Sequence, residues 1–203
     1  MRWRWRSADE ERPYPDWIKL PVTAWTLVLI PIYWRDYGPT NFLWFSDIAL
    51  FAVVVSLWTR WRLPYSMMAV GVLPLEMVWF VDFFAGGSLF GAAAYMFEGD
   101  RPAYLRALSL FHLFLPPVLV LMLYRQGYDE RAVFAQTALA WIVLPVTWLL
   151  TDPADNINAV WGLDEVQSDL HPLAYLALYM AALPLLVHLP MHFVLRRVFG
   201  PRG

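Results

Sequence analysis

The sequence has no cysteine, and this absence removes several kinds of chemistry. It excludes disulfide bonds, thiolate metal sites, iron–sulfur clusters, c-type haem attachment and cysteine nucleophiles. Lysine is almost absent too, since Lys19 is the only one, and it precedes the first predicted membrane span. A retinal or pyridoxal Schiff base within a membrane is therefore not expected. The identity of any cofactor is left unknown.

Charged residues are also few, at 16% of the 203 residues, whereas soluble domains carry about 25%. Hydrophobic residues make up 60%, and the 12 Trp and 10 Tyr residues suit aromatic belts at the two membrane surfaces. The net charge of −2 gives no indication of a nucleic-acid partner. These proportions predict an all-α, polytopic membrane protein.

Six apolar segments are long enough, or nearly so, to cross a bilayer as helices, which takes roughly 17–25 residues. The predicted spans are residues 20–34, 41–58, 65–86, 103–124, 131–150 and 172–199. The first is short, and the last is long enough to tilt. Residues 1–19 are expected to form a basic and aromatic arm on the cytoplasmic leaflet, and residues 200–203 a short cytoplasmic tail.

The basic residues predict which way the chain faces. With six spans, 12 of the 15 Lys and Arg residues lie on one side of the membrane and 3 on the other, namely Arg35, Arg101 and Arg106. Because basic residues concentrate on the cytoplasmic side, this division predicts that both termini are cytoplasmic. Leaving out residues 20–34 would divide the same residues 7 to 8, so the basic residues also favour that segment as a true span.

Ionisable residues inside membrane spans are costly, which makes each one a candidate for a site. Asp47 and Asp82 are each expected a few residues inside the outer ends of their spans, and His112 roughly 13 Å inside its own, at 1.5 Å per residue. These similar depths predict an outward-facing polar pocket that contains all three. Glu76 is expected deeper, near the midplane, where Pro74 frees a carbonyl with which it could pair.

His112 is the candidate general base, because imidazole exchanges protons near neutral pH. Ser109 lies three residues earlier on the same predicted helical face and is its candidate catalytic partner, with Asp47 or Asp82 orienting the ring. The alternative is that His112 bonds a neighbouring helix and Ser109 bonds its own backbone. The two aspartates could bind a proton or an ion, act as structural hydrogen-bond partners, or cap loop amides.

His188 and His192 are four residues apart, a spacing that places two ligands on one helical face. No acidic residue or third histidine is expected at their depth, so no metal site is predicted. They are also expected in the opposite leaflet from His112, which argues against a haem held between two histidines.

The most polar irregular stretch follows the fifth predicted span, at residues 151–162. It contains Asp155, Asn156 and Asn158, which we predict to line the outward-facing pocket. The Asp-Pro and Asp-x-Asn patterns are ordinary turn chemistry, whereas the apolar residues after them favour burial. The stretch is therefore either a plain connector or a segment that folds over the mouth of the bundle.

Three stretches carry a recognisable pattern: residues 37–47 (YGPTNFLWFSD), residues 108–112 (LSLFH), and Asp152-Pro153 with Asn156-Ile157-Asn158 through to Gly162. Together they resemble an uncharacterised bacterial family of small polytopic integral membrane proteins, over most of the chain after the arm. The family has Trp after the second Asn, where this chain has Ala159. The resemblance implies the bacterial inner membrane and no particular activity. A looser likeness to integral membrane acyltransferases and lipid hydrolases concerns His112 alone.

Two classes of function stay open. The sequence favours a non-enzymatic subunit or binding protein for a lipid, a pigment or a membrane partner, because it shows no complete set of nucleophile, base and acid. The alternative is an intramembrane lipid-directed hydrolase, acyltransferase or small transporter in which His112 acts as the base. The expected partners are membrane lipids, with other membrane subunits or a hydrophobic small molecule as further candidates.

Overall fold

The computed structural model describes residues 13–163 and 166–200, and within these ranges every regular element is a helix. This confirms the all-α prediction. The α-helices are α1 Asp16–Tyr37, α2 Phe45–Thr59, α3 Arg62–Gly71, α4 Leu73–Phe84, α5 Ala103–Ser109, α6 Phe111–Gln126, α7 Ala132–Leu150, α8 Pro172–Leu183 and α9 Leu189–Phe199. Shorter elements are the 3-10 helices η1 Pro39–Leu43, η2 Ala94–Met96 and η3 Ile157–Ala159, and the π-helical turn η4 Pro184–His188. Most of the predicted N-terminal arm and cytoplasmic tail lies outside the described residues.

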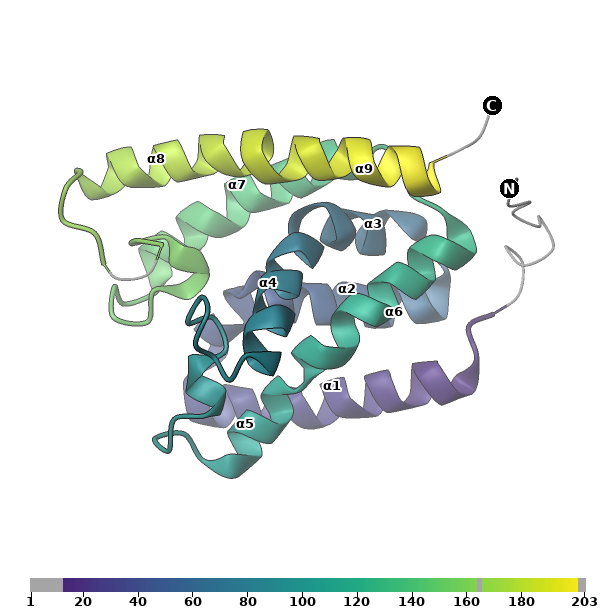
Figure 1. Cartoon of the computed structure of the whole chain (residues 1–203), viewed down its shortest axis with the longest axis horizontal. Helices are drawn as coiled ribbons and strands as arrows, with labels where there is room; N and C mark the ends of the chain where they lie inside the picture. Colours follow the sequence, from purple (N-terminus) through teal and green to yellow (C-terminus); the bar gives the residue numbers. More distant parts are fainter. Residues whose placement is uncertain (1–12, 164–165, 201–203) are drawn as a thin grey trace.

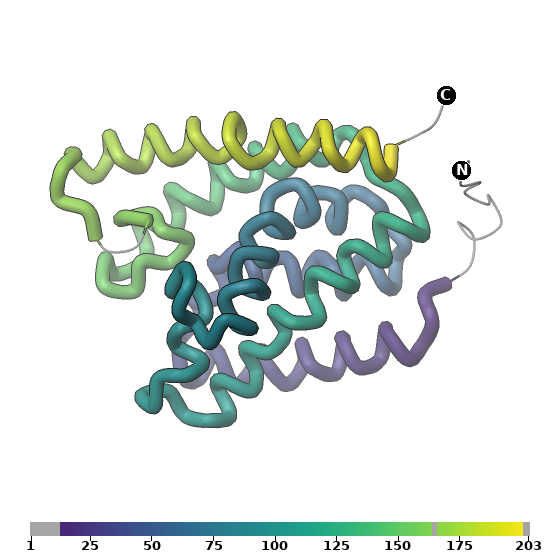
Figure 2. The backbone as a smooth tube through the Cα atoms, viewed as in Figure 1, coloured from purple at the N-terminus to yellow at the C-terminus, as the bar shows by residue number. Residues whose placement is uncertain are grey.

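The helices form one bundle in which successive long segments run in alternating directions (Figures 1 and 2). In this view α1 lies along one side, α8 continues into α9 along the opposite side, and α2, α3, α4 and α6 lie between them. The start of α1 and the end of α9 lie at the same end of the bundle (Figure 1), which we call the terminal end. The connections around α5 and after α7 gather at the other end, the loop end.

Four helical segments are long and apolar enough to cross a membrane, namely α1, residues 103–126, α7 and residues 172–199. The pair α3–α4 makes a fifth if it counts as one span, although its two halves are bent by 57°. α2 has only 15 residues, which reach about 22 Å against roughly 30 Å of hydrocarbon. The structure therefore shows four to five helices that are long and apolar enough to span a membrane, and the six spans that the sequence predicts stay a prediction.

The first predicted span is longer than expected, because α1 has 22 residues. It begins at Asp16, whose carboxylate lies 2.9 Å from Nζ of Lys19. The same ammonium group lies 4.7 Å from the centre of the Trp58 ring. Lys19 is thus part of α1, whereas the sequence places it at the end of the N-terminal arm. An acidic residue in a first turn stabilises a helix, so these polar residues mark a helix start rather than a loop.

Two helix breaks place the candidate residues. Pro74 has no N–H for the carbonyl four residues before it, and the chain bends between α3 and α4 at Val72. α6 continues through Pro116 and Pro117, and the break falls at Leu110, between α5 and α6. As a result Glu76 lies in the first turn of α4 and His112 is the second residue of α6.

The surface and the interior of the bundle differ in the way that a membrane requires. α3 packs against α7 so closely that a Cβ atom at Gly71 would clash with the Gln136 side chain. Facing outward, Leu27, Ile142 and Leu186 are 65%, 65% and 73% exposed. Apolar surface of this extent is typical of a membrane or protein interface, which agrees with the apolar spanning helices.

Candidate functional site

The candidate site centres on a hydrogen bond between two ionisable side chains, Glu76 of α4 and His112 of α6. Nδ1 of His112 lies 2.7 Å from Oε2 of Glu76. Only 14% of the His112 side chain and 5% of the Glu76 side chain are exposed. A carboxylate at Nδ1 fixes the orientation of an imidazole and leaves Nε2 for proton exchange. Within the described part of the chain, Nε2 of His112 makes no hydrogen bond.

Aromatic rings enclose this pair. The Trp79 ring stacks on the His112 ring with centroids 4.6 Å apart, and the Phe111 ring lies 4.1 Å from it. Trp79 is itself buried and stacks on Phe83 at 5.2 Å. Such surroundings keep water away and strengthen electrostatic interactions. The few polar groups near the Glu76–His112 pair therefore interact with it strongly.

Ser109 does not meet His112 in the way that the sequence predicts. Its Oγ lies 3.0 Å from the Tyr33 hydroxyl and 3.2 Å from the carbonyl oxygen of Leu105. α5 ends at Ser109 and α6 begins at Phe111, so Ser109 and His112 do not share one continuous helical face. The structure thus gives Ser109 the role of a bridge between α1 and α5, and not that of a catalytic partner of His112.

Asp47 is a second buried acid near the pair. It lies in the first turn of α2 and is 2% exposed. Its Oδ2 accepts a hydrogen bond of 3.2 Å from the Asn41 side chain, while its Oδ1 has no partner among the described residues. Asp47 lies close enough to Glu76 and Tyr33 for electrostatic interaction with both. The structure therefore brings Asp47 toward the pair, although the acid bound to His112 is Glu76.

Asp82 faces its own loop instead of the other candidates. One carboxylate oxygen accepts the backbone N–H groups of Leu89 and Phe90, both at 2.9 Å, and the other accepts that of Ala93 at 2.8 Å. The Asp82 side chain has no exposed surface, and this loop supplies its hydrogen bonds. The prediction that Asp82 lines a pocket with Asp47 and His112 is therefore wrong, and Asp82 is an anchor for residues 85–97.

Residues 85–97 cover the candidate site, and we call them the cover loop. Ala93 and Met96 pack with Trp79 in a buried cluster separate from the main core. Arg106 donates a hydrogen bond of 3.0 Å to the Met96 carbonyl oxygen. Burial raises the pKa of Tyr95 to about 12, so its hydroxyl, which lies near Ser109 and Trp79, stays protonated. The cover loop thus packs on Trp79, whose ring stacks on His112.

The stretch at residues 151–162 docks elsewhere, on the start of α2. Asn158 accepts a hydrogen bond of 3.0 Å from the backbone N–H of Phe45 and donates one of 2.7 Å to the Leu43 carbonyl oxygen. Asn156 bonds within its own loop, to Gly162 and Trp161. Asp155 is exposed. Of the three predicted pocket residues, only Asn158 reaches the neighbourhood of the site, where it holds the turn that precedes Asp47.

The two remaining histidines of the bundle lie toward the terminal end. Nδ1 of His188 is 3.0 Å from the Thr137 hydroxyl, and Nδ1 of His192 is 2.8 Å from the Tyr128 hydroxyl. Burial raises the pKa of Tyr128, which keeps that hydroxyl protonated. Among the described residues, no group of three or more His, Asp or Glu side chains is placed to hold a metal ion.

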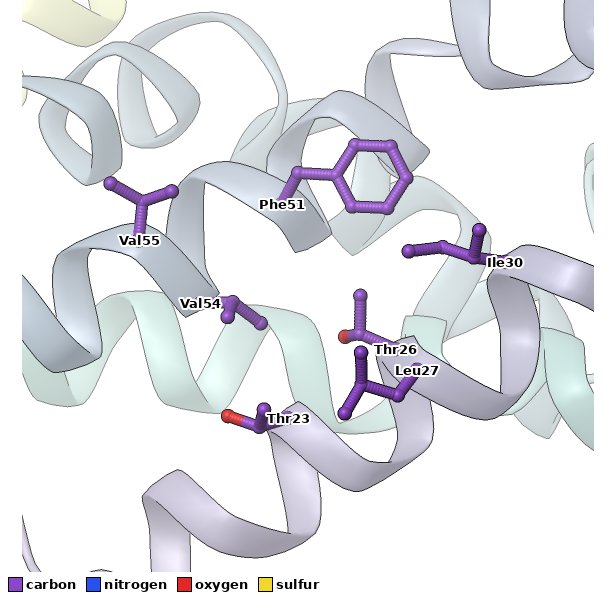
Figure 3. A pocket seen from close by; sticks show the side chains of 7 residues that line it. All are labelled: Thr23, Thr26, Leu27, Ile30, Phe51, Val54 and Val55. Atoms are coloured by element: carbon purple, nitrogen blue, oxygen red, sulfur yellow. The ribbon is translucent and has the colours of Figure 1, made fainter.

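An open groove of about 210 Å³ runs between α1 and α2 (Figure 3). It is lined by Thr23, Thr26, Leu27, Ile30, Phe51, Val54 and Val55. Both threonine hydroxyls are engaged, one with the Trp58 indole and the other with the Val22 carbonyl. The groove therefore offers a ligand only hydrocarbon contacts, and it contains none of the polar residues of the candidate site.

Glu76 is the important residue that the pocket prediction leaves out. A signal for it exists in the sequence, since Glu76 lies ten residues before Gly86, a depth of about 15 Å at 1.5 Å per residue. That value nearly equals the roughly 13 Å expected for His112. Tyr33 and Trp79 carry no such signal, because aromatic residues occur throughout the chain.

No family model, no curated protein and no solved structure matches this chain. The resemblance to small bacterial membrane proteins therefore stays a prediction.

Proposed function

We propose that the chain crosses the bacterial inner membrane six times with both termini in the cytoplasm. The alternating helix directions and the shared end of α1 and α9 support this topology (Figure 1). α2 is preceded by η1, and the two helices occupy residues 39–59 with Trp44 between them. The uneven division of basic residues supplies the orientation.

A reporter fused after Gly203 should then indicate a cytoplasmic location. A reporter inserted between Asp152 and Asp155 should indicate a periplasmic location, because this exposed turn lies at the loop end. Alkaline phosphatase and green fluorescent protein fusions measure the two locations. A periplasmic signal from the fusion after Gly203 contradicts the topology.

Within this topology we propose that the protein is a small transporter that binds and releases a proton at the Glu76–His112 pair. The observation that carries the proposal is the 2.7 Å hydrogen bond between the two side chains inside an aromatic enclosure. Paired ionisable groups within membrane helices are typical of proton relays. Glu76 holds the imidazole through Nδ1, and Nε2 accepts and releases the proton.

The same geometry favours proton exchange over covalent hydrolysis. A serine hydrolase needs its nucleophile within hydrogen-bond reach of the base, whereas the Ser109 hydroxyl bonds Tyr33 and Leu105. A second candidate function rests on the unengaged Nε2, which could act as a general base toward a lipid hydroxyl or water without a protein nucleophile. A purely structural subunit, which the sequence favours, has no need of a free imidazole nitrogen in this enclosure.

Proton flux into lipid vesicles tests the proposal. The purified protein is reconstituted with a pH-sensitive dye inside, and a potassium gradient with valinomycin drives protons inward. Vesicles with the natural chain should acidify at least tenfold faster than vesicles with Glu76→Gln or His112→Asn. The His171→Asn variant is the control, because His171 caps α8 outside the bundle interior and asparagine keeps that cap.

Flux equal to that of empty vesicles would overturn the transport proposal. In that case the second candidate is examined with the same vesicles, made of phosphatidylethanolamine and phosphatidylglycerol, by mass spectrometry of the lipids. Loss of lipid turnover in the His112→Asn variant would support the general-base function. If the lipids are unchanged as well, a structural subunit is the candidate function that stands.

A further inference from the structure

Asp47 combines two properties that are rarely found together. It is 2% exposed, and its Oδ1 has no hydrogen-bond partner among the described residues. Its other oxygen receives a single bond, of 3.2 Å, from Asn41. Buried carboxylates usually accept several hydrogen bonds or face a cation, as Asp82 does with its three backbone donors.

The groups around Asp47 do not supply the missing positive charge. Its electrostatic neighbours are Glu76 of α4 and the neutral hydroxyl of Tyr33 on α1. Among the described residues of this cluster, the side chain that can become cationic is His112 of α6, and that imidazole is already hydrogen-bonded to Glu76. Two carboxylates and one imidazole leave one negative charge uncompensated even when the imidazole is protonated. Burying such a charge is unfavourable.

A purely structural explanation for Asp47 is that it stabilises the start of α2. It is an acidic residue in the first turn of α2, where the helix dipole favours negative charge. That role needs no burial, and its carboxylate makes no bond to a backbone N–H of the first turn. The orphaned oxygen therefore calls for a different explanation.

We propose that Asp47 is the binding site for one monovalent cation, a proton or Na⁺, which neutralises the Asp47–Glu76–His112 cluster. The inference rests on the proposed function, since it names the group on which the transported or coupled cation resides. A divalent metal does not fit, because the described residues offer no set of three carboxylate or imidazole ligands in reach of one ion. With the cation on Asp47 and a proton on His112, the two carboxylates of the cluster are both compensated.

The test is the melting temperature of the purified Asp47→Asn variant beside that of the natural chain. Asparagine keeps the size of the side chain and removes the uncompensated charge. Both proteins are measured in NaCl and in choline chloride at equal ionic strength, and over a range of acidic to alkaline buffers. Asp155→Asn is the matched control, because Asp155 is exposed.

We expect Asp47→Asn to melt higher than the natural chain in alkaline choline chloride by several degrees. Acidification should close this gap if the cation is a proton, and NaCl should close it if the cation is Na⁺. A variant that melts lower than the natural chain under all conditions would show a helix-start role and overturn the inference. So would a gap that neither acid nor NaCl changes.

Vesicle flux separates this inference from the proposed function. Asp47→Asn should reduce proton flux at least tenfold although it raises the melting temperature. If His112→Asn stops the flux while Asp47→Asn conducts like the natural chain, the inference fails and the proposed function stands. If the natural chain itself shows no flux, the proposed transport fails, and the melting comparison alone decides whether Asp47 binds a cation.

Discussion

Replacing Glu76 by Leu is expected to lower the free energy of unfolding by about 3 kcal/mol, because it leaves the His112 imidazole buried without its partner. The two side chains are 2.7 Å apart and at most 14% exposed, so water cannot replace the lost hydrogen bond. Removing one member of a buried pair costs more than removing both. His112→Leu should therefore have an effect of similar size.

The double variant Glu76→Leu/His112→Leu should be less destabilised than the sum of the two single variants, by about 1–3 kcal/mol. Unfolding in detergent, followed by Trp fluorescence, measures this coupling free energy. Glu76→Gln is the control, because its amide oxygen can still accept a hydrogen bond from His112. Additive effects would show that the two side chains do not interact, which would contradict the geometry on which the proposed function depends.

Replacing Asp82 by Ala is expected to detach the cover loop while the helices stay folded. The change removes the acceptor for three backbone N–H groups, those of Leu89, Phe90 and Ala93. Hydrogen bonds from a backbone N–H to a carboxylate are among the strong ones, and no other side chain of this loop offers a carboxylate. The Glu76–His112 pair should then become accessible from the loop end.

Limited digestion with chymotrypsin measures this detachment, since the cover loop contains Phe90, Tyr95 and Phe97 as cleavage sites. Asp82→Ala should be cut there at least tenfold faster than the natural chain, and Asp82→Asn at an intermediate rate, because its amide keeps one acceptor oxygen. Asp155→Ala serves as the control. Equal cleavage rates for Asp82→Ala and the natural chain would mean that the packing of Ala93 and Met96 on Trp79 holds the loop without Asp82.

The sequence predicts depth within the membrane better than it predicts direction around a helix. Counting residues from the outer ends of the spans places Asp47, Asp82 and His112 at similar depths, and Glu76 only slightly deeper than His112. Which side chains meet then depends on the rotation of each helix and on breaks such as those at Val72 and Leu110. Asp82 lies six residues beyond Glu76 on α4, about 1.7 turns, and consequently faces a different neighbour.

Hydrogen bonds between side chains and distant backbone groups are a second feature that the sequence does not predict. Asn158 bonds the backbone on either side of Trp44, more than 110 residues away along the chain. Asp82 bonds a loop that has few polar residues of its own. In both cases the partner is a peptide group, which every residue has, so residue types cannot identify it. The turn pattern at residues 151–162 predicts an irregular segment, but not the place where it docks.

Infrared difference spectroscopy on vesicle-embedded protein tests the central claim most directly, because it observes a proton on the Glu76–His112 pair itself. An acid step should change the bands of a buried carboxyl group and of an imidazole together. Both changes should be lost in Glu76→Gln and in His112→Asn, whereas the Asp47→Asn variant should lose a separate carboxyl band. If the natural chain and the Glu76→Gln variant give the same difference spectrum, the pair does not exchange protons, and the proposed function is contradicted.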